Sequence, residues 1–124
     1  MQDFRKLRVW QASQEVADRV YEVTAGFPPG NNTLKEQVRD AADSVSSNIA
    51  EGCGRDSRKE MAHFLHIAVG STNEVDNDLT RARRIGLIKD PVLLPLQDQV
   101  IDLRKMLVAL IKRVREGHTE LGTT

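Results

Sequence analysis

The sequence predicts an all-α protein, an antiparallel up-down-up-down four-helix bundle that forms one domain over residues 1–124. Three observations predict this fold. Apolar residues recur at alternating steps of three and four in four segments, the pattern of helices that each bury one face. The connections between these segments are a few residues long, so consecutive helices fold back on each other. No segment shows the alternation and β-branched enrichment of a strand.

The first helix is expected over residues 7–25. Val9, Val16 and Val20 keep its inward face, and Trp10 and Tyr21 belong to a second row on the flank of that face. Two consecutive prolines follow. Because proline removes a backbone donor and restricts the residue before it, they end the helix.

The second helix is expected over residues 33–52. Thr33 and Glu36 have the spacing of a capping box, in which each side chain satisfies a free amide of the first turn. Alanines and serines fill the second half, which allows a neighbouring helix to approach closely. Gly52 is expected to close the helix in the left-handed conformation that glycine adopts at little cost.

The third helix is expected over residues 57–85. Ser57 and Glu60 form a second candidate capping box, and Gly86 is placed to end the helix. Its apolar residues keep the four-three rhythm throughout. At ~1.5 Å per residue it is the longest helix in the chain, roughly 43 Å.

The fourth helix is expected over residues 92–116. Asp90 is predicted as its N-cap and Pro91 as a first-turn residue. Pro95 would lose a backbone hydrogen bond within the helix, so the regular part is expected to begin nearer Leu94. The apolar rhythm after that point is the clearest in the chain.

The composition of the chain limits the classes of function and the compartment that we expect for it. Lys plus Arg and Asp plus Glu are both 18, which argues against an indiscriminate nucleic-acid binder and leaves room for a local basic patch. A single cysteine permits no internal disulfide and fits a reducing compartment. No apolar run approaches the ~18 residues of a membrane span, and the first residues lack a signal-peptide core. We therefore expect a cytoplasmic protein with no membrane partner, and no motif implies a cofactor.

The chain has more apolar residues than one buried row per helix requires. Two explanations remain open: a broad core, or an interface with another copy of the chain. The candidate interface residues are Trp10, Tyr21, Leu94, Ile101, Val108 and Ile111.

The cations cluster in three groups that an up-down bundle brings to one end, because the second connection lies at the same end as both termini. There they would form a patch for phosphate or nucleic acid. The last group also has a structural explanation, since cations stabilise a helix C-terminus. The groups are Arg5, Lys6 and Arg8, then Arg55, Arg58 and Lys59, then Lys112, Arg113 and Arg115.

Two constellations raise the question of catalysis. Glu74 and Asp78 share a helix face and are the residues that a magnesium-dependent phosphohydrolase would use. A solvated helix face is the ordinary alternative. Glu60 and His63 form half of a di-iron bundle motif whose second half is absent from the sequence, and His63 points away from the predicted core. The sequence therefore predicts no catalytic residue and no metal ligand.

Cys53 lies between two glycines, near cations and the start of a helix. These features can lower the pKa of a thiol. No histidine adjacent in sequence can serve as its base, so a structural thiol is the favoured interpretation.

Several motifs resemble a bacterial four-helix bundle family, first known as proteins encoded in intervening sequences of 23S ribosomal RNA genes. The resemblance covers nearly the whole chain. The motifs are Phe4-x-x-Leu7-x-Val9-Trp10-Gln11-x-Ser13, Phe27-Pro28, Gln37-Val-Arg-Asp-Ala-Ala-Asp-Ser44-Val-x-x-Asn48-Ile-Ala-Glu51-Gly52, Gly70-Ser71-x-x-Glu74 and Gly86-Leu-Ile88.

The resemblance implies a small bundle that assembles into a ring, typically a homopentamer. It also implies a relation to the accessory variability determinant of diversity-generating retroelements, which binds its reverse transcriptase and nucleic acid. Those accessory proteins are markedly basic, whereas this chain is neutral. The motifs further indicate a polar network that fixes the register of the second and third helices. Its candidate members are Asn48, Glu51, Ser71 and Glu74.

The sequence thus favours a non-enzymatic, ring-forming bundle that acts as an adaptor for RNA, DNA or a nucleic-acid-processing partner. A protein-only assembly scaffold is the alternative from the binding class. A metal-dependent phosphohydrolase that uses Glu74 and Asp78 is the alternative from the enzyme class.

Overall fold

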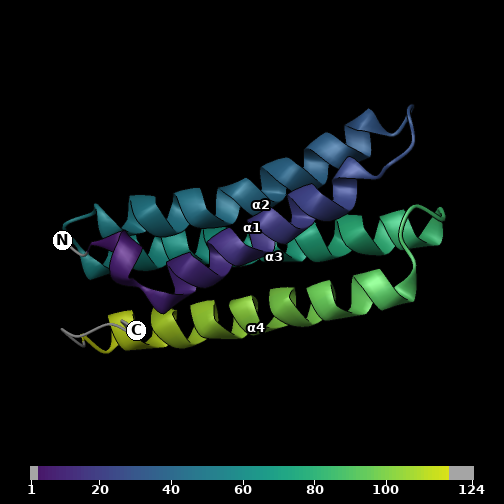
Figure 1. Ribbon diagram of the computed structural model, residues 1–124. Helices are drawn as coiled ribbons and strands as arrows, with labels where there is room; N and C mark the ends of the chain where they lie inside the picture. Colours follow the sequence, from purple (N-terminus) through teal and green to yellow (C-terminus); the bar gives the residue numbers. More distant parts are fainter. Residues whose placement is uncertain (1–2, 118–124) are drawn as a thin grey trace.

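The structure, a computed structural model, describes residues 3–117. Its elements are a short 3-10 helix η1 (Phe4–Lys6) and the α-helices α1 (Arg8–Ala25), α2 (Asn32–Cys53), α3 (Arg58–Arg84) and α4 (Asp90–Arg115). Consecutive α-helices run in opposite directions (Figure 1). The predicted all-α up-down-up-down bundle is confirmed, and each predicted helix end lies within two residues of the observed one.

The helices pack in a square. α1 packs beside α2 and α4, and α3 packs beside the same two helices, whereas in the described chain the backbones of the diagonal pairs α1 and α3, and α2 and α4, do not come within 8 Å between Cα atoms. The core is filled by the apolar rows that the three-four spacing predicts. Its largest fully buried side chains are Leu7, Ile49, Leu65, Leu79, Leu93, Leu96, Leu103, Leu107, Val20, Val38, Val45 and Val75.

Both predicted ends of the third helix are formed. The Ser57 hydroxyl accepts a hydrogen bond from the Glu60 amide at 3.1 Å, so serine caps α3 as expected. Gly86 has a φ of 86°. The Leu87 amide donates to the Ala82 carbonyl at 2.8 Å, which is the long hydrogen bond of a Schellman motif.

The capping box predicted for the second helix is not formed. Asn31, not Thr33, is the N-cap of α2, and it makes no side-chain hydrogen bond to the first turn. The side-chain amide of Asn31 instead donates a hydrogen bond to the Pro28 carbonyl oxygen at 3.0 Å. The tight turn around Gly30 occupies the Asn31 side chain and leaves it unavailable for capping.

The prediction that Gly52 ends α2 in the left-handed conformation is wrong. The helix continues to Cys53, and the C-cap is Gly54 at a φ of −83°. Glycine at position 52 serves packing instead. A Cβ there would lie 3.2 Å from both the Met61 carbonyl oxygen and the Phe64 Cβ, so its absence lets α2 and α3 approach closely.

The substitution Gly52→Val is therefore expected to lower the free energy of unfolding by about 1–3 kcal/mol, the usual cost of overpacking. Gly70→Val is the matched control, because no atom lies within 4 Å of a Cβ at this exposed position in α3. The control is expected to stay within about 0.5 kcal/mol of the parent. Urea denaturation followed by circular dichroism measures both, and equal midpoints for the two variants would contradict the packing role.

The fourth helix begins earlier than predicted. Lys89 is its N-cap, Asp90 is its first helical residue, and Pro95 lies inside the helix. The Arg83 guanidinium donates two hydrogen bonds to the Asp90 carboxylate, which fixes the first turn against the end of α3. Because Leu93 and Leu96 are buried on either side of Pro95, core packing offsets the hydrogen bond that proline loses.

Candidate nucleic-acid interface

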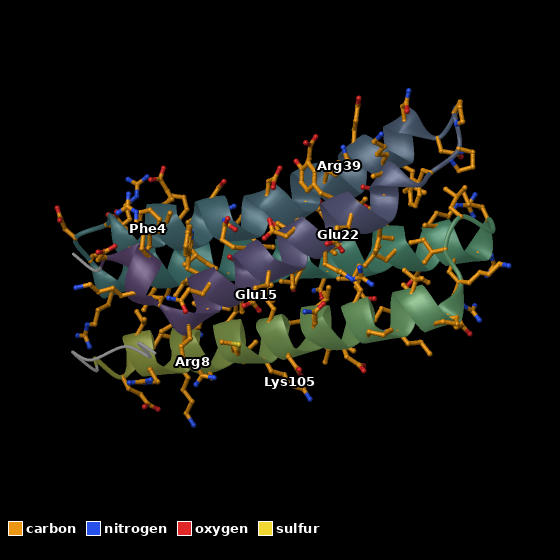
Figure 2. All side chains as sticks on the ribbon, in the orientation of Figure 1. Phe4, Arg8, Glu15, Glu22, Arg39 and Lys105 are labelled. Carbon is orange, nitrogen blue, oxygen red and sulfur yellow. The ribbon has the colours of Figure 1, made fainter. Side chains whose placement is uncertain are left out.

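The three predicted cation groups lie at one end of the bundle. Figure 1 shows both ends of the described chain and the α2–α3 connection together, with the other two connections at the opposite end. Phe4 and Arg8 lie at this same end in Figure 2. We call it the basic end, and its nine candidate contacts are Arg5, Lys6, Arg8, Arg55, Arg58, Lys59, Lys112, Arg113 and Arg115.

A cleft opens at the basic end between the first turns of α3 and the last turn of α4. Arg58, Lys59 and Arg115 line it together with Asp56, Ser57 and Ala62. Arg115 lies 2.8 Å from the His66 ring nitrogen Nε2, which holds its guanidinium against α3. A side chain at Gly117 would collide with the Arg58 guanidinium, so glycine at this position leaves room for that group.

The cations of the cleft differ from others at the basic end in their ion pairing. Arg5 lies 3.6 Å from the Asp3 carboxylate, and Arg55 lies 3.4 Å from Glu51. Within residues 3–117, no ion pair involves Arg58, Lys59 or Arg115. Three positive charges therefore face a cleft whose lining includes a single carboxylate, and an anion can bind there without displacing a salt bridge.

Two guanidinium groups of the basic end stack on aromatic rings. The Arg55 guanidinium carbon lies 4.6 Å from the centre of the Phe64 ring, and His63 meets that ring edge-on. Arg5 lies over Phe4 at the same distance. Phe64 is not among the site residues that the sequence predicts, although an aromatic residue off the buried row and close to a cationic turn was the signal that could have identified it.

The structure joins two members of the predicted polar network through a residue that the prediction left out. Ser44 accepts a hydrogen bond from the Asn48 amide at 3.0 Å and another from the Ser71 hydroxyl at 3.0 Å. Glu51 pairs instead with Arg55, and Glu74 lines an open groove. The α2–α3 contact thus has a short Asn48–Ser44–Ser71 chain.

The candidate acids Glu74 and Asp78 line one groove between α2 and α3, which Asp40 also lines. Burial raises the pKa of the Asp78 carboxyl, and the neighbouring Glu74 charge raises it further. Asp76 points the other way, to Gln97 of α4. No three His, Cys, Asp or Glu side chains among residues 3–117 are placed to hold a metal ion.

The hypothesis of a lowered thiol pKa is wrong. Cys53 is buried in the core, and this burial raises its pKa from 9.0 to about 11, with a further contribution from the Asp3 charge. The nearby cations do not offset the cost of placing a thiolate among apolar side chains.

The raised pKa predicts a loss of stability at high pH. Above about pH 9 the thiol ionises in the unfolded chain but stays protonated in the folded one, so the unfolded chain binds fewer protons. The free energy of unfolding should then fall as the pH rises toward the folded pKa. Cys53→Ala should show a shallower decline in its urea midpoint from about pH 8 to about pH 11. Identical slopes in parent and variant would contradict this prediction.

The candidate interface residues on α1 lie on the side of α2. Tyr21 donates a hydrogen bond to Asp43 of α2 at 2.5 Å, and its side chain is 39% exposed. Trp10 is half-buried and packs edge-on against Phe4 of η1, which also contacts α2. We call this surface the α1–α2 face.

The candidate interface residues on α4 lie on the side of α3. Leu94 and Val108 are 52% and 54% exposed, and Ile101 is half-buried. On α4 they neighbour Gln97 and Arg104, whose side chains form hydrogen bonds with residues of α3. We call this row the α3–α4 face.

Ile111 is the exception among the candidate interface residues. It is 4% exposed and belongs to the bundle core, so its prediction as a surface residue is wrong. α4 packs against α1 on one side and α3 on the other, and its buried arc is wide enough to include both Leu110 and Ile111.

The fold and the candidate site define a small antiparallel four-helix bundle with a cation-lined end and two candidate interface faces. No described helix combines the length and apolarity that crossing a membrane requires. The family of 23S rRNA-intervening sequence proteins matches residues 5–109, and the chain belongs to this family.

The structure is similar to that of a protein with unknown function from the S23 ribosomal protein family of Bacteroides thetaiotaomicron VPI-5482. The TM-score is 0.78 at 23% identity, over 84% of this chain and 98% of that one. At this identity the similarity shows the fold alone. No curated protein matches the chain.

Proposed function

We propose that this protein is a non-enzymatic, ring-forming bundle of the cytoplasm that acts as an adaptor for nucleic acid or for a nucleic-acid-processing partner. One observation carries the nucleic-acid part: Arg58, Lys59 and Arg115 line a single cleft, and no described ion pair neutralises them. Phosphates are the anions that Lys and Arg most often bind in this way, and they supply most of the affinity for a nucleic-acid backbone.

The positions of the two candidate interface faces allow the head-to-tail assembly that a ring requires. In the square arrangement of the helices, the α1–α2 face and the α3–α4 face lie on opposite sides of the bundle. When one face of a copy packs on the other face of the next copy, the contact is head-to-tail and can close into a ring. Five copies, the number that the family resemblance implies, would bring five basic ends to one surface.

Ring formation explains how a chain with zero formal charge can bind nucleic acid. A single basic end offers few phosphate contacts, and acidic residues elsewhere in the chain balance its positive charge. Repetition around an axis places several clefts within reach of one strand, so that each further contact becomes intramolecular. Affinity can then exceed that of one cleft by orders of magnitude without a net positive protein.

Fluorescence anisotropy of labelled single-stranded RNA and labelled duplex DNA, each at two salt concentrations, tests the proposal. We expect binding that weakens steeply with salt, because cations that bind phosphates release counterions. Absence of binding to both probes at low salt would remove the nucleic-acid part. A protein-only scaffold that assembles through the two candidate interface faces would then be the better account.

The phosphohydrolase alternative rests on the groove that Glu74, Asp78 and Asp40 share. Magnesium-dependent hydrolysis of a nucleotide that Glu74→Gln abolishes, with the melting temperature unchanged, would favour an enzyme over an adaptor.

A further inference from the structure

We propose that the basic end binds an unpaired strand, with phosphates in the Arg58–Lys59–Arg115 cleft and bases on the Arg55–Phe64 and Arg5–Phe4 stacks. This inference rests on the proposed function and narrows its ligand from any nucleic acid to a single strand. The proposed binding surface has two parts: the cleft, which is charged, and the two stacks, which are planar.

Each stack offers a flat, fixed and partly open surface. Phe64 lies against one face of the Arg55 guanidinium, and the Glu51 carboxylate forms an ion pair with it at 3.4 Å. Arg5 is held in the same way between Phe4 and Asp3. The Arg55 and Arg5 side chains are 40% and 70% exposed, so each guanidinium has a free side toward solvent. Guanidinium planes and aromatic rings are the surfaces on which proteins stack unpaired bases.

A duplex makes poor use of such planes. Its bases are already stacked inside the double helix, and its sides offer mainly phosphates and sugars. The cleft could bind a phosphate of either form, but only a single strand can also place a base on Arg55 or Arg5. The combination of a cleft and stacks therefore favours a single strand.

The chain contains a third stack that serves as a control. Arg39 of α2 lies 4.4 Å from the Tyr21 ring centre, but it donates to the Thr24 hydroxyl at 2.8 Å and to the Tyr21 carbonyl at 3.1 Å. Figure 2 places it on the half of α2 away from Phe4. It has the same chemistry outside the basic end, so it should contribute nothing to binding there.

Three probes of equal length separate the two parts: a single-stranded oligonucleotide, its duplex, and a strand with the same backbone but abasic sites in place of bases. The substitutions Arg55→Lys and Arg5→Lys keep each charge and remove each plane. Together they should weaken binding of the oligonucleotide about 10-fold or more, at about 1 kcal/mol or more per base. Binding of the abasic strand should stay within about twofold, and Arg39→Lys should change neither.

The outcomes distinguish this inference from the proposed function. Equal affinity for oligonucleotide and duplex, with no effect of the two lysine substitutions, would overturn the single-strand inference and leave phosphate binding intact. Failure of all three probes to bind would overturn the nucleic-acid part of the proposed function. A loss of similar size on the oligonucleotide and the abasic strand would show that the arginines act on phosphates and would also overturn the stacking role.

Discussion

Mixing the variants Tyr21→Arg and Val108→Arg is expected to produce a dimer, although each variant alone is expected to be a monomer. Both sites are exposed, on opposite faces of the bundle. Position 21 is exposed and lies beside Arg39, so the first substitution should add a second positive charge to the α1–α2 face without disturbing the fold. Arginine at position 108 does the same to the α3–α4 face, and the two positively charged faces repel each other.

This result follows from the head-to-tail geometry. A charge buried without a partner at an interface costs several kcal/mol, which is enough to separate subunits held by a small apolar surface. Each variant keeps one intact face, and the intact faces are complementary. One copy of each variant can therefore join through one contact, and the chain of contacts stops there.

Light scattering after size-exclusion chromatography measures the masses. Glu15→Arg, at an exposed α1 position outside both faces, is the control and should keep the parent mass. A different result is expected if like faces pair with each other. In that case Tyr21→Arg alone would retain a dimer through its α3–α4 face, and mixing would form no new species. Variants that both keep the parent mass would exclude these faces from the assembly.

The fold was predictable because the buried rows are long and regular. In α3 the rhythm continues from Met61 to Ala82, and every member of it is buried. Helix ends were less predictable where two roles compete for one residue. Glycine is typical of a helix end, so the local sequence predicts that role for Gly52. Its packing role depends on the distance between α2 and α3, and a local sequence pattern carries no such information.

The candidate site was predictable only to the level of topology. An up-down bundle requires the cation groups to meet at one end, and they do. The cleft depends on contacts between distant segments: Arg115 with His66, and Arg58 with Gly117. The burial of Ile111 has the same origin, because the width of the buried arc of α4 is set by the helices on both its sides. The sequence of one helix, considered by itself, predicts only one buried row of side chains.

Replacing Arg58, Lys59 and Arg115 together by glutamine is expected to remove most of the affinity for a single strand. Each phosphate contact lowers the slope of log affinity against log salt by about 0.7 for single strands. Three lost contacts reduce the steepness by about 2, which is a loss of about 50-fold at 0.15 M salt and several hundredfold at 0.05 M. The control exchanges the same charge at the opposite end, as Arg81→Gln, Arg84→Gln and Lys89→Gln.

The comparison of the two triple variants decides whether the cleft or the overall charge binds the strand. Both lose three positive charges from exposed positions, so their net charges match. Only the first loses the groups that face the cleft. If both weaken binding equally, the protein attracts nucleic acid by its charge alone and has no phosphate site at the basic end. If only the first does so, with a salt slope reduced by about 2, the strand is held where Arg58, Lys59 and Arg115 meet.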